Sequence, residues 1–298
     1  MNENKNIFMV ENDYLKVEID KIGGSLNSVI LKETGTEYLW QGDPKYWDEK
    51  APNLFPFIGR LNGSRFTHGE KSYEMKLHGF LRNQELEPVK SDKDEIILNF
   101  DGEKWVHENK YPFDFNLNLS FKLNKNEIIC TYEIENKSAE TMYFAVGGHP
   151  GINLPLESGL KFEDYRIEFP SECKPKRVIF SSAGLTTEER PSFILDENNG
   201  FDLEHSLFDN DAIVLTDTPH EVMLKSEKGK RFVTLRYDDM PYIGFWHADK
   251  TDAPYVCLEP WTSLPGRDGV EEEISRMNDR IEINSGESKK ISWSLEVN

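Results

Sequence analysis

Cysteine is scarce in this sequence. Three occur in 298 residues, at Cys130, Cys173 and Cys257, with no CxxC pair. Three isolated cysteines cannot build a disulfide framework, and their spacing does not match a structural zinc site. The first residues hold no apolar signal core, and no apolar run approaches the length that spans a bilayer. These absences predict a soluble cytoplasmic protein with reduced thiols and no membrane partner.

Basic residues are also in the minority. There are 35 Lys and Arg against 54 Asp and Glu, a net charge of −19. A negative field repels phosphate backbones, which argues against nucleic acid as a partner. The chain has no GxSxG, no Walker-type loop, no GxGxxG and no HExxH. We therefore expect no cofactor and no metal. A metal held by histidines from distant strands stays open, but no residue pattern favours one.

The dominant pattern that is present has a period of two. Apolar residues at positions 115, 117, 119, 121 and 123 alternate with polar ones, as in a strand with one buried face. The same alternation returns at residues 291–297. Shorter strand-like runs occupy residues 14–19, 95–100, 127–135, 222–225, 231–237 and 255–258.

Helical patterns are nearly missing. Only short segments, such as residues 268–276, are compatible with a helix, and no strand–helix–strand alternation occurs. No Pro/Ser-rich linker, repeat or low-complexity tract divides the chain. The sequence predicts the all-β class, with one large antiparallel β-sandwich as a single domain over residues 1–298.

Four polar residues have unusual neighbours. His149 lies in Gly-Gly-His-Pro-Gly, where the glycines allow a tight corner that displays the imidazole. Glu259 ends an apolar run before Pro-Trp, where desolvation would raise its pKa and suit it to accept a proton. Arg60 and His78 can donate hydrogen bonds to hydroxyls. Each also has a structural interpretation, which for Glu259 is pairing with Arg267. Together they suit proton transfer on a neutral, polyol-like substrate.

In chain order, the segments around these residues resemble the aldose 1-epimerase (galactose mutarotase-like) family, most closely its LacX-type branch. The matching segments are residues 46–47 (YW), 51–60 (APNLFPFIGR), 77–82 (LHGFLR), 144–153 (FAVGGHPGIN) and 257–261 (CLEPW). The resemblance implies the family's β-supersandwich. It also implies interconversion of the α and β anomers of a free hexose through the open-chain aldehyde.

The resemblance also implies residue roles. Glu259 would be the general base at the C1 hydroxyl, and His149 the general acid at the ring oxygen. The implied substrate-binding residues are Arg60, His78, Asp211, Asn53 and Trp246. Asn210 takes the place of Asp211 if the alignment shifts by one residue. Trp246 would present an aromatic face to the sugar.

Two other functions remain open. The His-Gly-Phe-Leu-Arg form of the His78 segment is shared with hexose-phosphate epimerases, so Arg82 would bind the phosphate of a hexose 6-phosphate. Alternatively, the chain is a non-catalytic carbohydrate-binding or sensing protein. Retention of both His149 and Glu259 favours an enzyme. The expected partner is a small-molecule sugar, and the expected state a monomer or weak homodimer.

Overall fold

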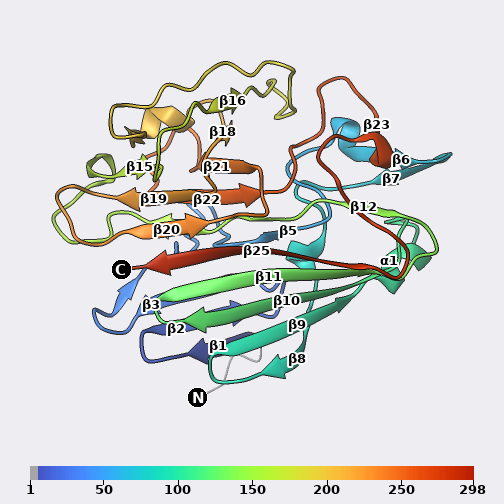
Figure 1. Cartoon of the computed structure of the whole chain (residues 1–298), viewed down its shortest axis with the longest axis horizontal. Coiled ribbons are helices and arrows are strands. Elements are labelled where there is room, and N and C mark those ends of the chain that lie inside the picture. Colours follow the sequence, from blue (N-terminus) through green and yellow to red (C-terminus); the bar gives the residue numbers. More distant parts are fainter. Residues whose placement is uncertain (1–5) are drawn as a thin grey trace.

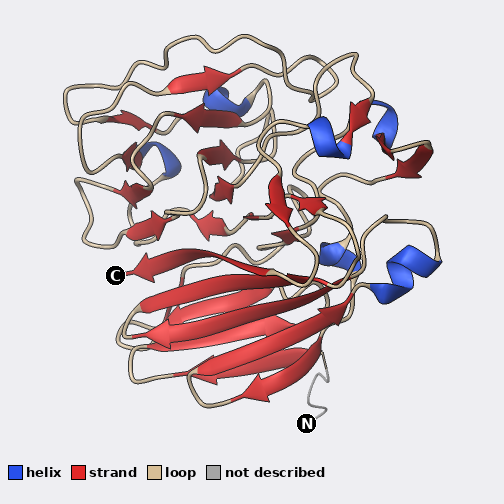
Figure 2. Ribbon diagram, turned by 45° about the vertical axis from the view of Figure 1, so that its right-hand side comes forward, coloured by secondary structure: helices blue, strands red, loops and turns tan. Residues whose placement is uncertain are grey.

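A computed structural model describes residues 6–298. Residues 1–5, on which the expectation of a missing signal core partly rests, lie outside that range. Strands and loops make up nearly all of the described chain (Figure 2). The one α-helix in residues 6–298 is the five-residue α1 (Glu103–His107). No helix among these residues is long and apolar enough to cross a membrane. The all-β class is confirmed.

The largest sheet has nine strands, and the long period-two segments form its centre. Its order is β17 (Gly200–Asp202), β15 (Arg166–Glu168), β19 (Glu221–Lys225), β20 (Val233–Arg236), β25 (Ser288–Val297), β11 (Glu127–Asn136), β10 (Phe115–Asn124), β9 (Glu95–Asp101) and β8 (Glu87–Ser91). Every second residue of β10 is buried, as the alternation predicts. In Figure 1 these long strands cross the lower half of the molecule side by side.

A four-stranded sheet packs against that centre. It consists of β1 (Ile7–Glu11), β2 (Leu15–Asp20), β3 (Leu26–Leu31) and β4 (Thr36–Glu37). Val17 and Val29 from this sheet share one buried apolar cluster with Leu117 and Leu119 of β10. The two layers therefore enclose a common core, as a β-sandwich does.

A seven-stranded sheet lies in the upper half in Figure 1. Its order is β16 (Lys176–Val178), β18 (Ile213–Thr216), β21 (Tyr242–Trp246), β22 (Tyr255–Trp261), β13 (Gly147–Gly148) and β5 (Asn53–Leu54), with β14 (Gly151–Asn153) also pairing with β22. All seven residues of β22 are buried. Its side chains therefore face either the core or an enclosed cavity.

The remaining elements are short. They are the strands β6 (Arg65–His68), β7 (Lys71–Glu74), β12 (Met142–Phe144), β23 (Glu272–Glu273) and β24 (Ile281–Ile283), and the 3₁₀ turns η1 (Asn62–Ser64), η2 (Leu81–Asn83), η3 (Phe162–Asp164), η4 (His205–Phe208) and η5 (Ile274–Arg276). The helix-compatible segment 268–276 forms no α-helix: β23 covers residues 272–273, and the 3₁₀ turn η5 covers residues 274–276. Gly269 has a φ of 72°, and the Glu272 carboxylate binds the backbone and guanidinium of Arg267. Both features are incompatible with a regular helix.

Candidate active site

A cavity of about 880 Å³ gathers most of the predicted site residues. The predicted members that line it are Arg60, His78, His149, Asp211, Trp246 and Glu259. Asn210 lines it as well, so the alternative to Asp211 stays open. These residues come from β21, β22 and the loops around the seven-stranded sheet. Residues up to 200 positions apart in the sequence thus line one cavity.

Two buried catalytic candidates, Glu259 and His149, meet at the floor of the cavity. Glu259 lies on β22 with 2% of its surface exposed, opposite Gly244 on β21. A Cβ on Gly244 would lie 3.2 Å from the Glu259 Cβ, so glycine leaves space around the carboxyl group. His149 follows β13, and its Nε2 lies 3.1 Å from Glu259 Oε2. The structural alternative for Glu259 is not realised, because Arg267 pairs with Glu272.

Aromatic rings hold His149 in place. The imidazole lies against Trp47, with ring centroids 4.9 Å apart, and meets Trp246 edge to face at 5.7 Å. Only 7% of His149 is exposed. Its second ring nitrogen, Nδ1, is buried and has no hydrogen-bond partner among the described residues. The imidazole is therefore fixed by packing, with one nitrogen committed to Glu259.

Burial shifts the pKa of both partners toward their neutral forms. Desolvation, reinforced by the Arg82 charge, lowers the pKa of His149 to about 3. Desolvation, reinforced by the Asp211 charge, raises the pKa of Glu259 well above its usual value. Burial thus disfavours the charged form of each group. Because His149 Nε2 and Glu259 Oε2 are 3.1 Å apart, the two groups titrate as a coupled pair, in which one proton is held by either member.

His78 is oriented by its backbone neighbours. Its Nδ1 accepts a hydrogen bond from the Gly59 N–H at 3.1 Å. Burial, followed by the charges of His149, Arg82 and Arg60, lowers the pKa of His78 well below its usual value. A neutral imidazole that accepts at Nδ1 carries its hydrogen on Nε2. His78 therefore supplies one N–H donor at the cavity wall.

Gly79 sets the position of His78, and its replacement tests that role. Gly79 has a φ of 76°, and a Cβ there would lie 2.2 Å from the Phe55 carbonyl oxygen. We expect Gly79→Ala to lower the free energy of unfolding by about 3 kcal/mol or more, because rigid backbone must move. Gly69→Ala is the matched control, since Gly69 has a φ of 58° with nothing within 4 Å. It should cost only about 1 kcal/mol. Urea denaturation measures both, and equal losses would contradict the steric argument.

Arg60 and Asp211 both line the cavity beside Gly184. A Cβ on Gly184 would lie 3.3 Å from Arg60 Cδ and 3.7 Å from Asp211 Oδ2. Asp211 has a φ of 77°, and its carboxylate accepts from the Ala212 N–H at 2.7 Å. The Arg60 carbonyl accepts from Gly266 at 2.8 Å, which anchors its backbone. A cation and an anion thus line the same part of the cavity, able to donate to and accept from neighbouring hydroxyls.

Asn53 is the predicted residue that the structure does not bring into the cavity. It is 2% exposed, and its amide nitrogen donates to the carbonyls of Gly23 at 2.9 Å and Gly24 at 2.8 Å. Its carbonyl oxygen accepts from the Tyr132 hydroxyl at 2.6 Å. Because these bonds use its polar atoms, Asn53 ties β5 to the β2–β3 turn. The geometry assigns it to the fold rather than to substrate contact.

Other cavity residues were not assigned from the sequence. Trp47 belongs to a matching segment, which is the signal that could have found it. Glu49 carries no such signal, yet its carboxylate accepts a hydrogen bond from Arg82 at the cavity wall. Asp249 and Lys250, on the loop after β21, complete the rim. These side chains determine the charge that a substrate meets.

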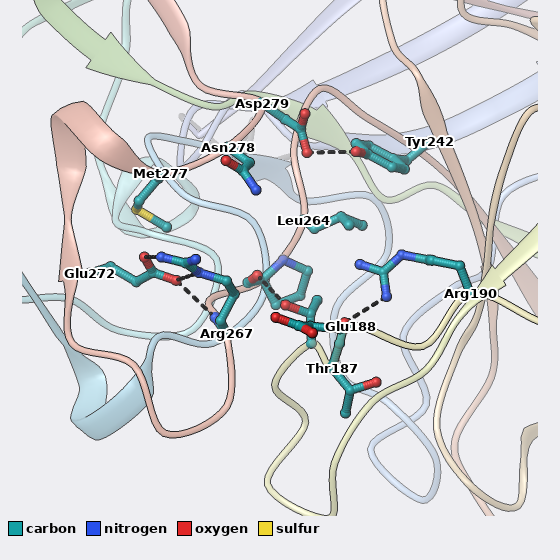
Figure 3. A pocket seen from close by; sticks show the side chains of 12 residues that line it. Thr187, Glu188, Arg190, Tyr242, Leu264, Arg267, Glu272, Met277, Asn278 and Asp279 are labelled. Carbon is teal, nitrogen blue, oxygen red and sulfur yellow. Dashed lines mark hydrogen bonds and ion pairs between the residues drawn. The ribbon is translucent and has the colours of Figure 1, made fainter.

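A second cavity, of about 530 Å³, is drawn in Figure 3. Thr186 and Pro265 line it, and Pro265 also lines the larger cavity. Thr186 N–H donates to the Gly266 carbonyl at 2.9 Å, and Gly266 N–H donates to the Arg60 carbonyl at 2.8 Å. The Tyr242 hydroxyl donates to Asp279 at 2.6 Å within this cavity. None of the predicted acid, base or binding residues lines it. The larger cavity is therefore the candidate active site.

Solved structures share this fold. A galactose mutarotase related enzyme from Lactobacillus acidophilus superposes with a TM-score of 0.90 at 30% identity, covering 98% of this chain and 97% of that chain. A galactose mutarotase-like protein from Lactobacillus casei has a TM-score of 0.90 at 25% identity, covering 98% of this chain and 100% of that chain. The chain therefore has the galactose mutarotase-like fold, as the sequence predicts.

Sequence comparison defines the family. The aldose 1-epimerase family model matches residues 6–295. The chromosomal protein LacX of Lactococcus lactis subsp. lactis is 31% identical over 264 residues, which cover 86% of this chain and 87% of LacX. This chain belongs to the aldose 1-epimerase family, and the predicted resemblance is confirmed.

Proposed function

We propose that this protein is an aldose 1-epimerase that interconverts the α and β anomers of a free hexose by general acid–base catalysis. The observation that carries the proposal is the buried pair on the cavity floor, with His149 Nε2 3.1 Å from Glu259 Oε2. A protein that only binds sugar has no need of a desolvated acid–base pair. Membership of the aldose 1-epimerase family supports the same activity.

The geometry of the pair suits ring opening. Opening requires loss of the C1 hydroxyl proton and gain of a proton by the ring oxygen. Both oxygens are bonded to C1, so two groups 3.1 Å apart can reach both at once. In the proposed step, the Glu259 carboxylate takes the hydroxyl proton while the His149 imidazolium protonates the ring oxygen. The C1–ring oxygen bond breaks, its electron pair goes to the ring oxygen, and the former O–H electrons form the C1 carbonyl.

Closure reverses these transfers on the opposite face of the carbonyl. Rotation about C1–C2 exposes that face, so the other anomer forms. The pair starts and ends with one proton, and no other reactant is consumed. A positioned acid and a positioned base each contribute roughly 10²–10⁴-fold in rate.

The other cavity residues would hold the sugar. Arg60 and the Nε2–H of His78 donate to ring hydroxyls, and Asp211 accepts from one. Trp246 and Trp47 offer aromatic surfaces beside the imidazole. Aromatic rings bind the apolar faces of molecules whose edges carry hydroxyls. This set suits an uncharged hexose.

Charge favours a free hexose over a hexose 6-phosphate. Besides Glu259, five carboxylates line the cavity: Asp48, Glu49, Asp209, Asp211 and Asp249. Three cations face them: Arg60, Arg82 and Lys250. The Arg82 guanidinium, the candidate phosphate ligand, is bonded to Glu49. A phosphate would have to displace that carboxylate within a negative field.

The proposal is tested by polarimetry. Fresh α-glucose or α-galactose should relax to anomeric equilibrium at a rate proportional to protein concentration. Sugar binding without acceleration would support the non-catalytic alternative. No acceleration of either sugar, together with acceleration of a hexose 6-phosphate, would overturn the free-hexose assignment.

The Glu49–Arg82 pair gives a sharper test of selectivity. We expect glucose 6-phosphate to inhibit glucose mutarotation at least about tenfold more weakly than galactose does, an energy difference of about 1.4 kcal/mol. Glu49→Gln should narrow this gap, because it frees Arg82 for the phosphate. Asp43→Asn is the control, since it removes one exposed carboxylate that does not line the cavity. Stronger inhibition by the phosphate in the unmodified protein would contradict the assignment.

A further inference from the structure

A thiol lies beside the acid–base pair. Cys257 precedes Glu259 by two residues on β22, so the two side chains point to the same face of the sheet. The Cys257 sulfur, a ring nitrogen of His149 and a carboxylate oxygen of Glu259 all lie within 4.8 Å of one another. All three residues are buried. The Cys257 sulfur has no role in the proposed reaction.

The three groups form a mixed sulfur, nitrogen and oxygen ligand set. Thiolate, imidazole and carboxylate are the ligands that Zn²⁺ and similar borderline-soft cations take, with three protein ligands and one open position in reactive sites. His149 and Glu259 line the cavity, which leaves that position open to water. The His149 ring, of which 7% is exposed, turns its Nε2 toward this set, 3.1 Å from Glu259 Oε2.

We propose that His149, Cys257 and Glu259 form an inhibitory site for a borderline-soft divalent cation such as Zn²⁺. Ligand atoms around tetrahedral Zn²⁺ stand about 3.5 Å apart, given metal–ligand bonds of about 2.0–2.3 Å. The His149–Glu259 contact of 3.1 Å is already near that spacing. The sulfur lies within 4.8 Å of the other two ligand atoms. Binding releases the thiol proton and any proton held by His149 Nε2 or by the Glu259 carboxyl group, and forms bonds from the cation to all three ligand atoms.

The bound cation would occupy both catalytic groups, so mutarotation stops while it is present. This inhibition rests on the proposed function, whereas cation binding does not. The thiol is otherwise unreactive, because burial, followed by the charge of Glu259, raises the pKa of Cys257 well above its ordinary value. A protonated, enclosed thiol is a poor nucleophile.

The test uses the full chain, reduced and stripped of metal, and titrated with Co²⁺. We expect one equivalent of Co²⁺ to bind with a thiolate-to-cobalt charge-transfer band and the visible bands of a four-coordinate ion. Zn²⁺ should displace it. Cys257→Ser should abolish the charge-transfer band and weaken binding by roughly 10–100-fold. If that variant does not fold, Cys257→Ala replaces the thiol without burying a hydroxyl group.

Cys173→Ser is the matched control, because Cys173 is a half-buried thiol outside the cavity. It should keep the band and the affinity of the unmodified protein. In parallel, Zn²⁺ should abolish mutarotation reversibly on chelation, and Cys257→Ser should resist it. No thiolate band, or a band unchanged in Cys257→Ser, would overturn the site. A charge-transfer band in a protein that shows no mutarotase activity would support the cation site and contradict the proposed function.

Discussion

Replacing Glu259 by Gln is expected to lower kcat for mutarotation by roughly 10²–10⁴-fold, the range that a positioned general base contributes. Gln has nearly the same shape and can still hydrogen-bond His149, whose Nε2 lies 3.1 Å from the carboxylate. It cannot take up or release the proton. Hexose affinity should change little, because the groups proposed to hold the hydroxyls stay in place. Polarimetry at saturating sugar gives kcat, and calorimetry gives the affinity.

Glu272→Gln is the matched control for Glu259→Gln. Both glutamates are 2% exposed, but Glu272 lies outside the large cavity and pairs with Arg267. We expect Glu272→Gln to reduce the free energy of unfolding by about 1–3 kcal/mol, since a charge-assisted pair is lost, while kcat is retained. Full activity in Glu259→Gln, or equal loss of kcat in both variants, would exclude Glu259 as the base.

The long strands could be predicted because their burial is one-sided. In β10 and β11 an apolar residue recurs at every second position, and those positions are the buried ones, except that the polar Asn136 is the last buried residue of β11. Strands of two residues, such as β5 and β13, offer no such pattern. They pair because surrounding elements bring them together, which is a tertiary effect. The absence of an α-helix at residues 268–276 has the same origin, since Glu272 is held by Arg267 rather than by a helical turn.

The catalytic candidates could be found because each has a local signal. His149 lies at a glycine corner, and Glu259 is a carboxylate within an apolar strand. Their 3.1 Å contact could not be predicted, because it depends on the register in which β14 pairs with β22, with Gly151 opposite Cys257. The same register brings the thiol into the cluster.

Asn53 shows the limit of reasoning from a motif. It stands in a segment that the family shares, but that context does not separate a residue that touches substrate from one that supports the backbone. The separation depends on the carbonyls of Gly23 and Gly24, thirty residues away, which its amide binds. The Arg82–Glu49 pair is similar, since no spacing in the sequence predicts it. Such partners are determined by how loops pack, and loops carry no periodic signal.

Replacing His149 by Ala is expected to lower kcat by a factor similar to that for Glu259→Gln, roughly 10²–10⁴-fold. The reason is that the ring oxygen then has no positioned proton donor. The change leaves a hollow between Trp47 and Trp246, which face the imidazole in the cavity. Free imidazole should enter that hollow and restore part of the activity. A purely structural role for His149 predicts no such rescue, so polarimetry with and without imidazole separates the two.

The double variant, Glu259→Gln with His149→Ala, tests whether the pair works as one unit. Groups that act together are strongly non-additive, so removing both costs little more than removing one. Because the proposed step moves both protons at once through two groups 3.1 Å apart, we expect the double variant to keep about the same residual kcat as either single variant. If the two residues contributed independently, the two losses would multiply, and kcat would fall by roughly 10⁴–10⁸-fold. Multiplicative loss would show that acid and base act in separate steps, and would reject the coupled proton transfer proposed for ring opening.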